Sequence, residues 1–107
     1  MRVYREDGIA IGPGKVALLE AIAEAGSITA AARQLGMSYR RAWTLVDEMN
    51  KALSSPVVTT AAGGSHGGGT ALSPTGEALV RHYRAAEDAA RLASAEAVAA
   101  LTRLLAD

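Results

Sequence analysis

Residues 26–50 read GSITAAARQLGMSYRRAWTLVDEMN, which predicts two helices joined by a turn of about three residues. Ser27 is a good N-cap, and the apolar residues after it follow the i, i+3, i+4, i+7 spacing of a short amphipathic helix. Gly36 suits the end of that helix, and Ser38 suits the N-cap of the next one. A period of 3.6 residues then predicts a second helix over residues 39–53. The stretch therefore predicts a helix-turn-helix.

The same period divides residues 39–53 into a buried face and an exposed face. The positions expected to be buried are Ala42, Leu45, Val46, Met49 and Leu53. The positions expected to point outward are Arg40, Thr44, Asp47 and Lys51, with Arg41 and Trp43 on the flanks. We expect Trp43 to pack at the edge of the core, because its ring is mostly apolar.

Two further elements are predicted upstream. Residues 15–25 have the apolar period of a helix, and Gly26 suits the left-handed residue that ends one. Residues 2–5 and 9–11 flank the dipeptide Asp7-Gly8, which suits a tight turn, so we expect a short two-stranded hairpin at the start of the chain.

Downstream, residues 57–60 and 70–72 predict the two strands of a second hairpin. Glycines in the connecting loop would let its backbone approach DNA, which favours a wing over an idle surface loop. A nucleotide-binding loop would need a lysine after its last glycine and a helix immediately beyond, so this reading is disfavoured. Ser73 and Pro74 suit the N-cap and first turn of a long helix that runs nearly to the C-terminus.

A seam of apolar residues follows this last helix. Its members alternate spacings of four and three: Leu79, Tyr83, Ala86, Ala90, Ala93, Ala97, Ala100 and Leu104. Such a pattern is typical of a coiled coil or an antiparallel helix pair, and small residues allow close packing. We therefore expect a homodimer paired through this helix. The alternative is a solvated, alanine-rich helix of high intrinsic propensity.

Together these elements predict a mainly α fold with a small β component. The expected architecture is a winged helix-turn-helix with a three-helix core, a β-hairpin wing and a long C-terminal helix. We expect residues 1–75 to form the DNA-binding domain and residues 76–107 to form a dimerisation helix within the same compact unit.

Composition excludes several classes of protein. The 107 residues include no cysteine, so disulfides, thiolate metal sites and thiol nucleophiles are ruled out. His66 and His82 are isolated, and no group of residues suggests catalysis, so we expect no metal, no cofactor and no enzymatic activity. No signal peptide or apolar run of about 20 residues occurs, which predicts a cytoplasmic protein with no membrane partner.

The charges are balanced, with 11 basic and 11 acidic residues, so a DNA-binding face must be local. In the major groove, an arginine can bond guanine O6 and N7 together, and a threonine can contact a thymine methyl. We expect Arg40 to read bases, and Ser38 and Tyr39 to bond phosphate. The full set predicted to contact DNA is Ser27, Thr29, Ser38, Tyr39, Arg40, Arg41, Thr44, Ser65 and His66.

Residues 26–50 resemble the helix-turn-helix of ModE-type molybdate-responsive regulators, which are distant relatives of LysR-type DNA-binding domains. SYRRAW, residues 38–43, is specific to the ModE type, whereas GSITAAA is shared broadly with LysR-type domains. The likeness continues through TTAAGGSHGGGTALSPTGEALVRHY, residues 59–83, which is similar to that family's glycine-rich wing and the start of its next helix.

The resemblance implies a dimeric repressor or activator that binds double-stranded DNA, with molybdenum-related genes as its targets. Regulators of the full type carry C-terminal molybdate-binding domains of the Mop kind, whereas this sequence ends at Asp107. We therefore expect either constitutive regulation or a separate molybdate-sensing partner. The neutral net charge keeps open an alternative, a protein-interaction module that pairs with another regulator without reading DNA itself.

Overall fold

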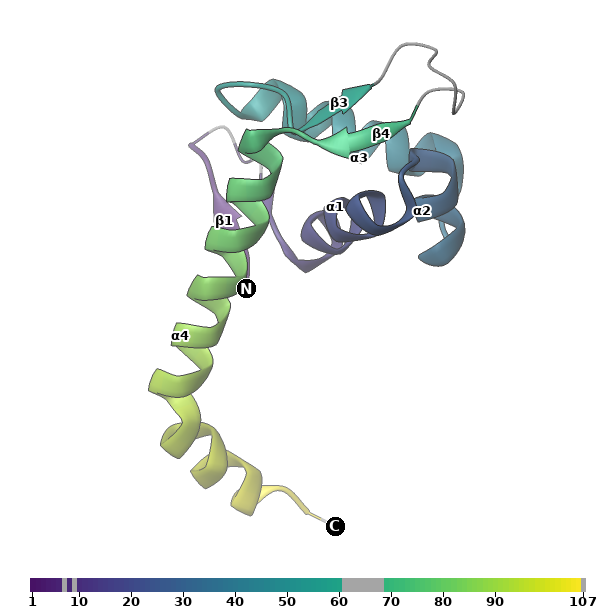
Figure 1. Ribbon diagram of the computed structural model, residues 1–107. Helices are drawn as coiled ribbons and strands as arrows, with labels where there is room; N and C mark the ends of the chain where they lie inside the picture. Colours follow the sequence, from purple (N-terminus) through teal and green to yellow (C-terminus); the bar gives the residue numbers. More distant parts are fainter. Residues whose placement is uncertain (7, 9, 61–68, 107) are drawn as a thin grey trace.

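The computed structural model describes residues 1–6, 8, 10–60 and 69–106. Its elements follow in the order β1 (Val3–Tyr4), β2 (Ala10–Ile11), α1 (Pro13–Ala25), α2 (Ile28–Gln34), α3 (Tyr39–Ala52), β3 (Val58–Thr60), β4 (Thr70–Leu72) and α4 (Pro74–Leu104). Figure 1 shows α1, α2, α3 and the β3–β4 hairpin gathered in one body, from which α4 extends away toward the C-terminus. The predicted fold class, a winged helix-turn-helix, is confirmed.

The core lies where α1, α2 and α3 meet. Its largest fully buried side chains are Leu18, Leu19, Ile22, Met49, Val16, Val46 and Val57. Each buried Leu, Ile, Val or Met contributes about 1.5–3 kcal/mol of hydrophobic free energy relative to an exposed one. Ala31 and Ala32 of α2 are also buried, and their small size lets the neighbouring helices approach closely. On α3, the predicted buried face is confirmed except at Leu53, which ends the helix and is only partly buried.

The three predicted serine N-caps are confirmed. The Oγ atoms of Ser27, Ser38 and Ser73 accept hydrogen bonds from the backbone N–H groups three residues on, each at 3.0 Å. Caps of this kind are worth about 1 kcal/mol each. Gly26 and Gly36 have φ values of 77° and 67°, the left-handed conformation that ends a helix, so the turn between α2 and α3 forms as predicted.

Both predicted hairpins are confirmed. At the N-terminus Val3 pairs with Ile11, and in the wing Val58 pairs with Leu72. The wing is tied to the body by the Thr70 N–H, which donates to the Gly26 carbonyl at 2.8 Å. Residues 61–68, which include the predicted contacts Ser65 and His66, lie outside the described residues.

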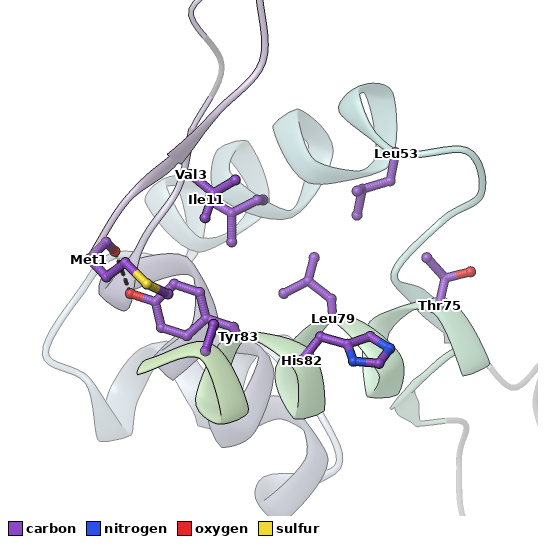
Figure 2. A pocket seen from close by; sticks show the side chains of 9 residues that line it. Met1, Val3, Ile11, Leu53, Thr75, Leu79, His82 and Tyr83 are labelled. Atoms are coloured by element: carbon purple, nitrogen blue, oxygen red, sulfur yellow. Dashed lines mark hydrogen bonds between the residues drawn. The ribbon is translucent and has the colours of Figure 1, made fainter. Parts of the chain in front are cut away.

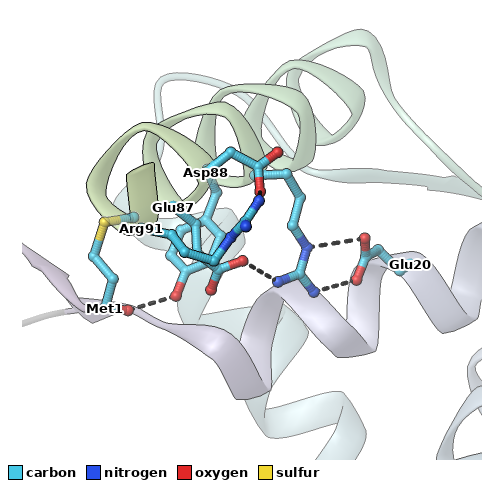
Figure 3. A network of polar contacts seen from close by, with 7 residues as sticks. Met1, Glu20, Glu87, Asp88 and Arg91 are labelled. Carbon is cyan, nitrogen blue, oxygen red and sulfur yellow. Dashed lines mark hydrogen bonds and ion pairs between the residues drawn. The ribbon is translucent and has the colours of Figure 1, made fainter. Parts of the chain in front are cut away.

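Helix α4 is anchored to the body only through its first turns. Tyr83 is buried and its hydroxyl donates to the Met1 carbonyl, while residues 88–106 are all exposed. Arg84 forms a two-pronged ion pair with Glu20 of α1, at 3.1 Å from Nε and 2.5 Å from Nη2, and its Nη1 lies 2.7 Å from Glu87 (Figure 3). These contacts fix the direction in which α4 leaves the body.

The ion pair predicts a small pH dependence of stability. Hydrogen bonding to Arg84 holds the pKa of Glu20 below its ordinary value of 4.5. The stabilisation is thus fully present above pH 4.5 and is lost as the pH falls through the lowered value. Because both side chains are about 40% exposed, we expect Glu20→Gln to cost only about 0.2–1 kcal/mol at pH 7. Urea unfolding at pH 7 and in acid measures this; a cost that persists unchanged in acid would contradict it.

Candidate nucleic-acid interface

The start of α3 presents most of the predicted DNA contacts on an exposed surface. Ser38, Tyr39, Arg40, Arg41 and Thr44 are all exposed, while the opposite face of the helix is buried in the core. These five side chains therefore lie exposed around the start of α3, at an edge of the fold, with Arg40 and Thr44 on the outward face that the period predicted and Arg41 on a flank.

Local hydrogen bonds determine what the hydroxyl groups can still offer. Ser38 accepts from the Arg41 N–H, which leaves its own proton free to donate to a phosphate oxygen. Thr44 donates to the Arg40 carbonyl at 3.0 Å, so it retains its acceptor lone pairs and its methyl group. The edge thus combines a donor suited to the DNA backbone with a group suited to a base amino group or a thymine methyl.

The positive charge at this edge is not cancelled by the acidic residues of α3. Asp47 pairs with Lys51 at 2.8 Å, and Glu48 pairs with Lys15 of α1 at 3.2 Å. The hydrogen bond to Asp47 raises the pKa of Lys51. Within the described part of the chain, no carboxylate pairs with Arg40 or Arg41. A chain of zero net charge therefore still has a local cationic edge.

An aromatic pair at the same edge was not foreseen. The rings of Tyr39 and Trp43 meet edge to face with centroids 6.3 Å apart, and the Trp43 indole N–H donates to the Tyr39 hydroxyl. Trp43 is 39% exposed, so most of its surface is covered and part of its ring faces solvent. Its role is to hold the Tyr39 side chain in place, leaving the phenolic proton available to an acceptor. The aromatic i, i+4 spacing was the signal for this pair.

The two DNA contacts predicted at the start of α2, Ser27 and Thr29, differ in exposure and in hydrogen bonding. The Ser27 hydroxyl caps the helix and is half-buried, whereas Thr29 is exposed in the first turn. Ser27 therefore stabilises the start of α2, and its hydroxyl proton can still donate a hydrogen bond to a phosphate oxygen.

A cavity of about 360 Å³ lies away from this edge, between the N-terminal hairpin, the end of α3 and the start of α4. Figure 2 shows its apolar lining, which includes Met1, Val3, Ile11, Leu79 and Tyr83. Among the described residues, no group of three or more metal-ligating side chains occurs, and no helix is long and apolar enough to cross a membrane.

More than half of this chain matches a known protein family. Residues 14–77 match the family described as bacterial regulatory helix-turn-helix protein, lysR family. The matched region covers all of α2, α3 and the β3–β4 strands.

Curated relatives are similar over most of this chain. The molybdenum-pterin-binding protein MopB of Rhodobacter capsulatus is 51% identical over 85 residues, which are 79% of this chain and 32% of the relative. The molybdenum transport protein ModE of Azotobacter vinelandii is 44% identical, over 81% of this chain and 32% of the relative. The DNA-binding transcriptional dual regulator ModE of Escherichia coli strain K12 is 39% identical, over 66% and 27%. The chain thus spans about a third of the length of these relatives.

A solved structure has a similar fold. A chain from the crystal structure of the CbnR_DBD–DNA complex superimposes with a TM-score of 0.64, covering 85% of this chain and 99% of that one. The two are 21% identical in sequence, so the likeness concerns the fold.

Proposed function

This chain belongs to the lysR family of bacterial regulatory helix-turn-helix proteins, and from that membership we propose that it is a sequence-specific transcriptional regulator of the ModE type. In this proposal it binds double-stranded DNA as a homodimer, with α3 in the major groove. The observation that carries the proposal is the exposed start of α3, where Arg40 and Arg41 have no carboxylate partner among the described residues. The proposed role is regulatory and not catalytic, in the bacterial cytoplasm.

We assign a base or a phosphate contact to each exposed side chain at the start of α3. Arg40 lies on the outward face of α3 and reads a guanine with its two-pronged guanidinium, while Thr44 contacts a neighbouring base. Ser38 and Tyr39 donate to backbone phosphates. We retain Ser27, Thr29 and Arg41 as phosphate contacts, and Ser65 and His66 as contacts from the wing.

A homodimer is proposed because one protomer alone would bind weakly. A few phosphate contacts per protomer give low affinity at physiological salt, and a second protomer doubles their number. The seam along α4 supports the pairing, since it is exposed beyond Tyr83 and ends in Leu104, which is 81% exposed and has the exposed Leu101 and Leu105 beside it.

The seam also suggests how the two helices pair. Its alternating spacings are symmetric about the point between Arg91 and Leu92, so an antiparallel pair brings Leu79 opposite the partner's Leu104, and Ala90 opposite the partner's Ala93. Leu79 and Tyr83 line the apolar cavity of Figure 2, which in such a dimer receives the leucine-rich end of the partner's helix. Residues 1–75 would then serve DNA binding and residues 76–107 dimerisation.

Replacement of Arg40 tests whether this side chain contacts a base. Arg40→Ala should relax discrimination at one base pair per half-site by about 1–3 kcal/mol, because the contact with guanine O6 and N7 is lost. The Arg40 side chain is exposed, so its removal leaves the packing of the fold intact. Selection from random duplex DNA measures the preference. The control is Arg103→Ala, which removes the same charge from the exposed end of α4. An unchanged preference in Arg40→Ala would count against the assignment.

The names of the relatives, which refer to molybdenum binding and transport, support molybdenum-related genes as targets. The resemblance to molybdate-responsive regulators suggests molybdate as the signal, sensed by this protein or by a separate partner chain. The rival proposal, an interaction module that pairs with another regulator, is favoured by the zero net charge and the exposed seam of α4. Binding to a selected DNA sequence by the purified chain alone distinguishes the two, and repeating the selection with molybdate tests the signal.

A further inference from the structure

A small pocket of about 170 Å³ lies beside α3, separate from the outward face that carries Arg40. Three cationic side chains from three parts of the chain line it: Arg2 before β1, Lys15 in the first turn of α1, and Arg41 in the first turn of α3. Its remaining lining consists of residues 12–14. The space is several times the roughly 30 Å³ occupied by a water molecule, so a hydrated tetrahedral oxyanion would fit.

The pocket keeps a positive charge. Glu48 pairs with Lys15, but among the described residues no carboxylate pairs with Arg2 or Arg41. The first turn of α1 contains no acidic residue. Arg2 and Arg41 therefore leave uncompensated positive charge at the cavity, in a chain whose total charge is zero. This concentration of charge favours an anionic ligand.

The position of the pocket points to a particular anion. A helix with its side chains is about 10–12 Å across, and the major groove is about 12 Å wide, so a helix in the groove has a phosphate backbone along each flank. Arg41 lies on the flank of α3 that faces α1, whereas Asn50 lies on the flank that faces the wing, where its Oδ1 accepts from the Val57 N–H. The pocket therefore opens beside the flank of α3 that is turned away from the wing.

We propose that this pocket binds a phosphodiester group of the DNA backbone, with Arg2 and Lys15 joining Arg41 as contacts. The inference rests on the proposed DNA-binding function and extends the interface to two residues outside the helix-turn-helix. A phosphate there sets the register of α3 in the groove without reading sequence.

The salt dependence of DNA binding by the full chain tests this. Each lost phosphate contact lowers the slope of log affinity against log salt by about 0.9. We expect Arg2→Gln to lower the slope by about that amount per protomer, and Arg2→Gln with Lys15→Gln by about twice as much, while the selected sequence is unchanged. The matched control is Arg81→Gln with Arg103→Gln, two exposed cations of α4. A slope equal to that of the control would overturn the proposal.

Two further measurements keep the outcomes distinct. Lys15→Gln also breaks the ion pair with Glu48 and so changes stability as well as charge, whereas Arg2 is exposed, so Arg2→Gln alone tests the contact if the double variant is destabilised. The slope is also measured on an unselected duplex, because phosphate contacts form there as well. If the protein selected no sequence, the proposed function would be contradicted, but the salt slopes on this duplex would still test the phosphate contact at the pocket. Stabilisation of the chain by inorganic phosphate without DNA, with unchanged slopes, would assign the pocket to a free oxyanion and overturn the backbone contact.

Discussion

Gly76→Ala is expected to lower the free energy of unfolding by about 3 kcal/mol, a large effect for the addition of one methyl group. A Cβ at this position would lie 2.1 Å from the Val57 carbonyl oxygen and 3.1 Å from the carbonyl carbon, both backbone atoms. Val57 cannot move aside cheaply, because it is fully buried, its carbonyl accepts from the Ser73 N–H, and its own N–H donates to Asn50. The close approach holds the start of α4 against the strand that enters the wing.

The matched control for this change is Gly14→Ala. Gly14 lies in the first turn of α1, has ordinary φ, and a Cβ there would meet no atom within 4 Å. We expect that substitution to be neutral or to stabilise by up to about 1 kcal/mol, through reduced freedom of the unfolded chain. Urea unfolding of both variants measures the difference, and equal stabilities would contradict the account of Gly76.

The second large effect concerns α4. Ala90→Glu should shift the protein from dimer to monomer and weaken binding to an operator with two half-sites by about 100-fold or more, because linked half-site binding is lost. In the proposed antiparallel pair Ala90 faces the partner's Ala93 near the twofold axis, where two carboxylates would meet in close quarters. Ala90 is exposed within the protomer, so its replacement leaves the fold of the body intact.

Ala99→Glu is the control for this substitution. Ala99 is also exposed and belongs to the same helix. It is nine residues after Ala90, which places it on the side of α4 opposite the seam. Sedimentation velocity gives the oligomeric state, and fluorescence anisotropy gives the affinity for DNA. The proposed dimer would be contradicted if Ala90→Glu and Ala99→Glu both remained dimeric and bound DNA equally well.

Local signals explain why so much of the fold could be predicted from the sequence. The N-caps Ser27, Ser38 and Ser73 and the glycines at positions 26 and 36 act within three or four residues, so their effect is visible in the sequence itself. The same holds for the apolar period of α3, whose exposed face gave most of the candidate site. The sequence motif that begins α4 was evident as a resemblance, but its reason, the contact of Gly76 with Val57, was not.

What could not be predicted depends on residues far apart in the chain. The ion pair of Arg84 with Glu20 joins residues 64 apart, and the hydrogen bond of Tyr83 to Met1 joins residues 82 apart. Neither partner carries a local signal, because the packing of α4 on α1 and on the N-terminal hairpin brings them together. The same is true of Arg2 and Lys15, whose approach to Arg41 requires the folded arrangement of three elements.

Selection from random duplex DNA by the purified chain, at two salt concentrations and with and without molybdate, tests the central claim most directly. The account predicts enrichment of an inverted repeat whose half-sites are centred one helical turn apart, about 34–36 Å, with affinity falling steeply as salt rises. Salt-sensitive binding without any enriched sequence, or no binding at all, would contradict it and favour the interaction module.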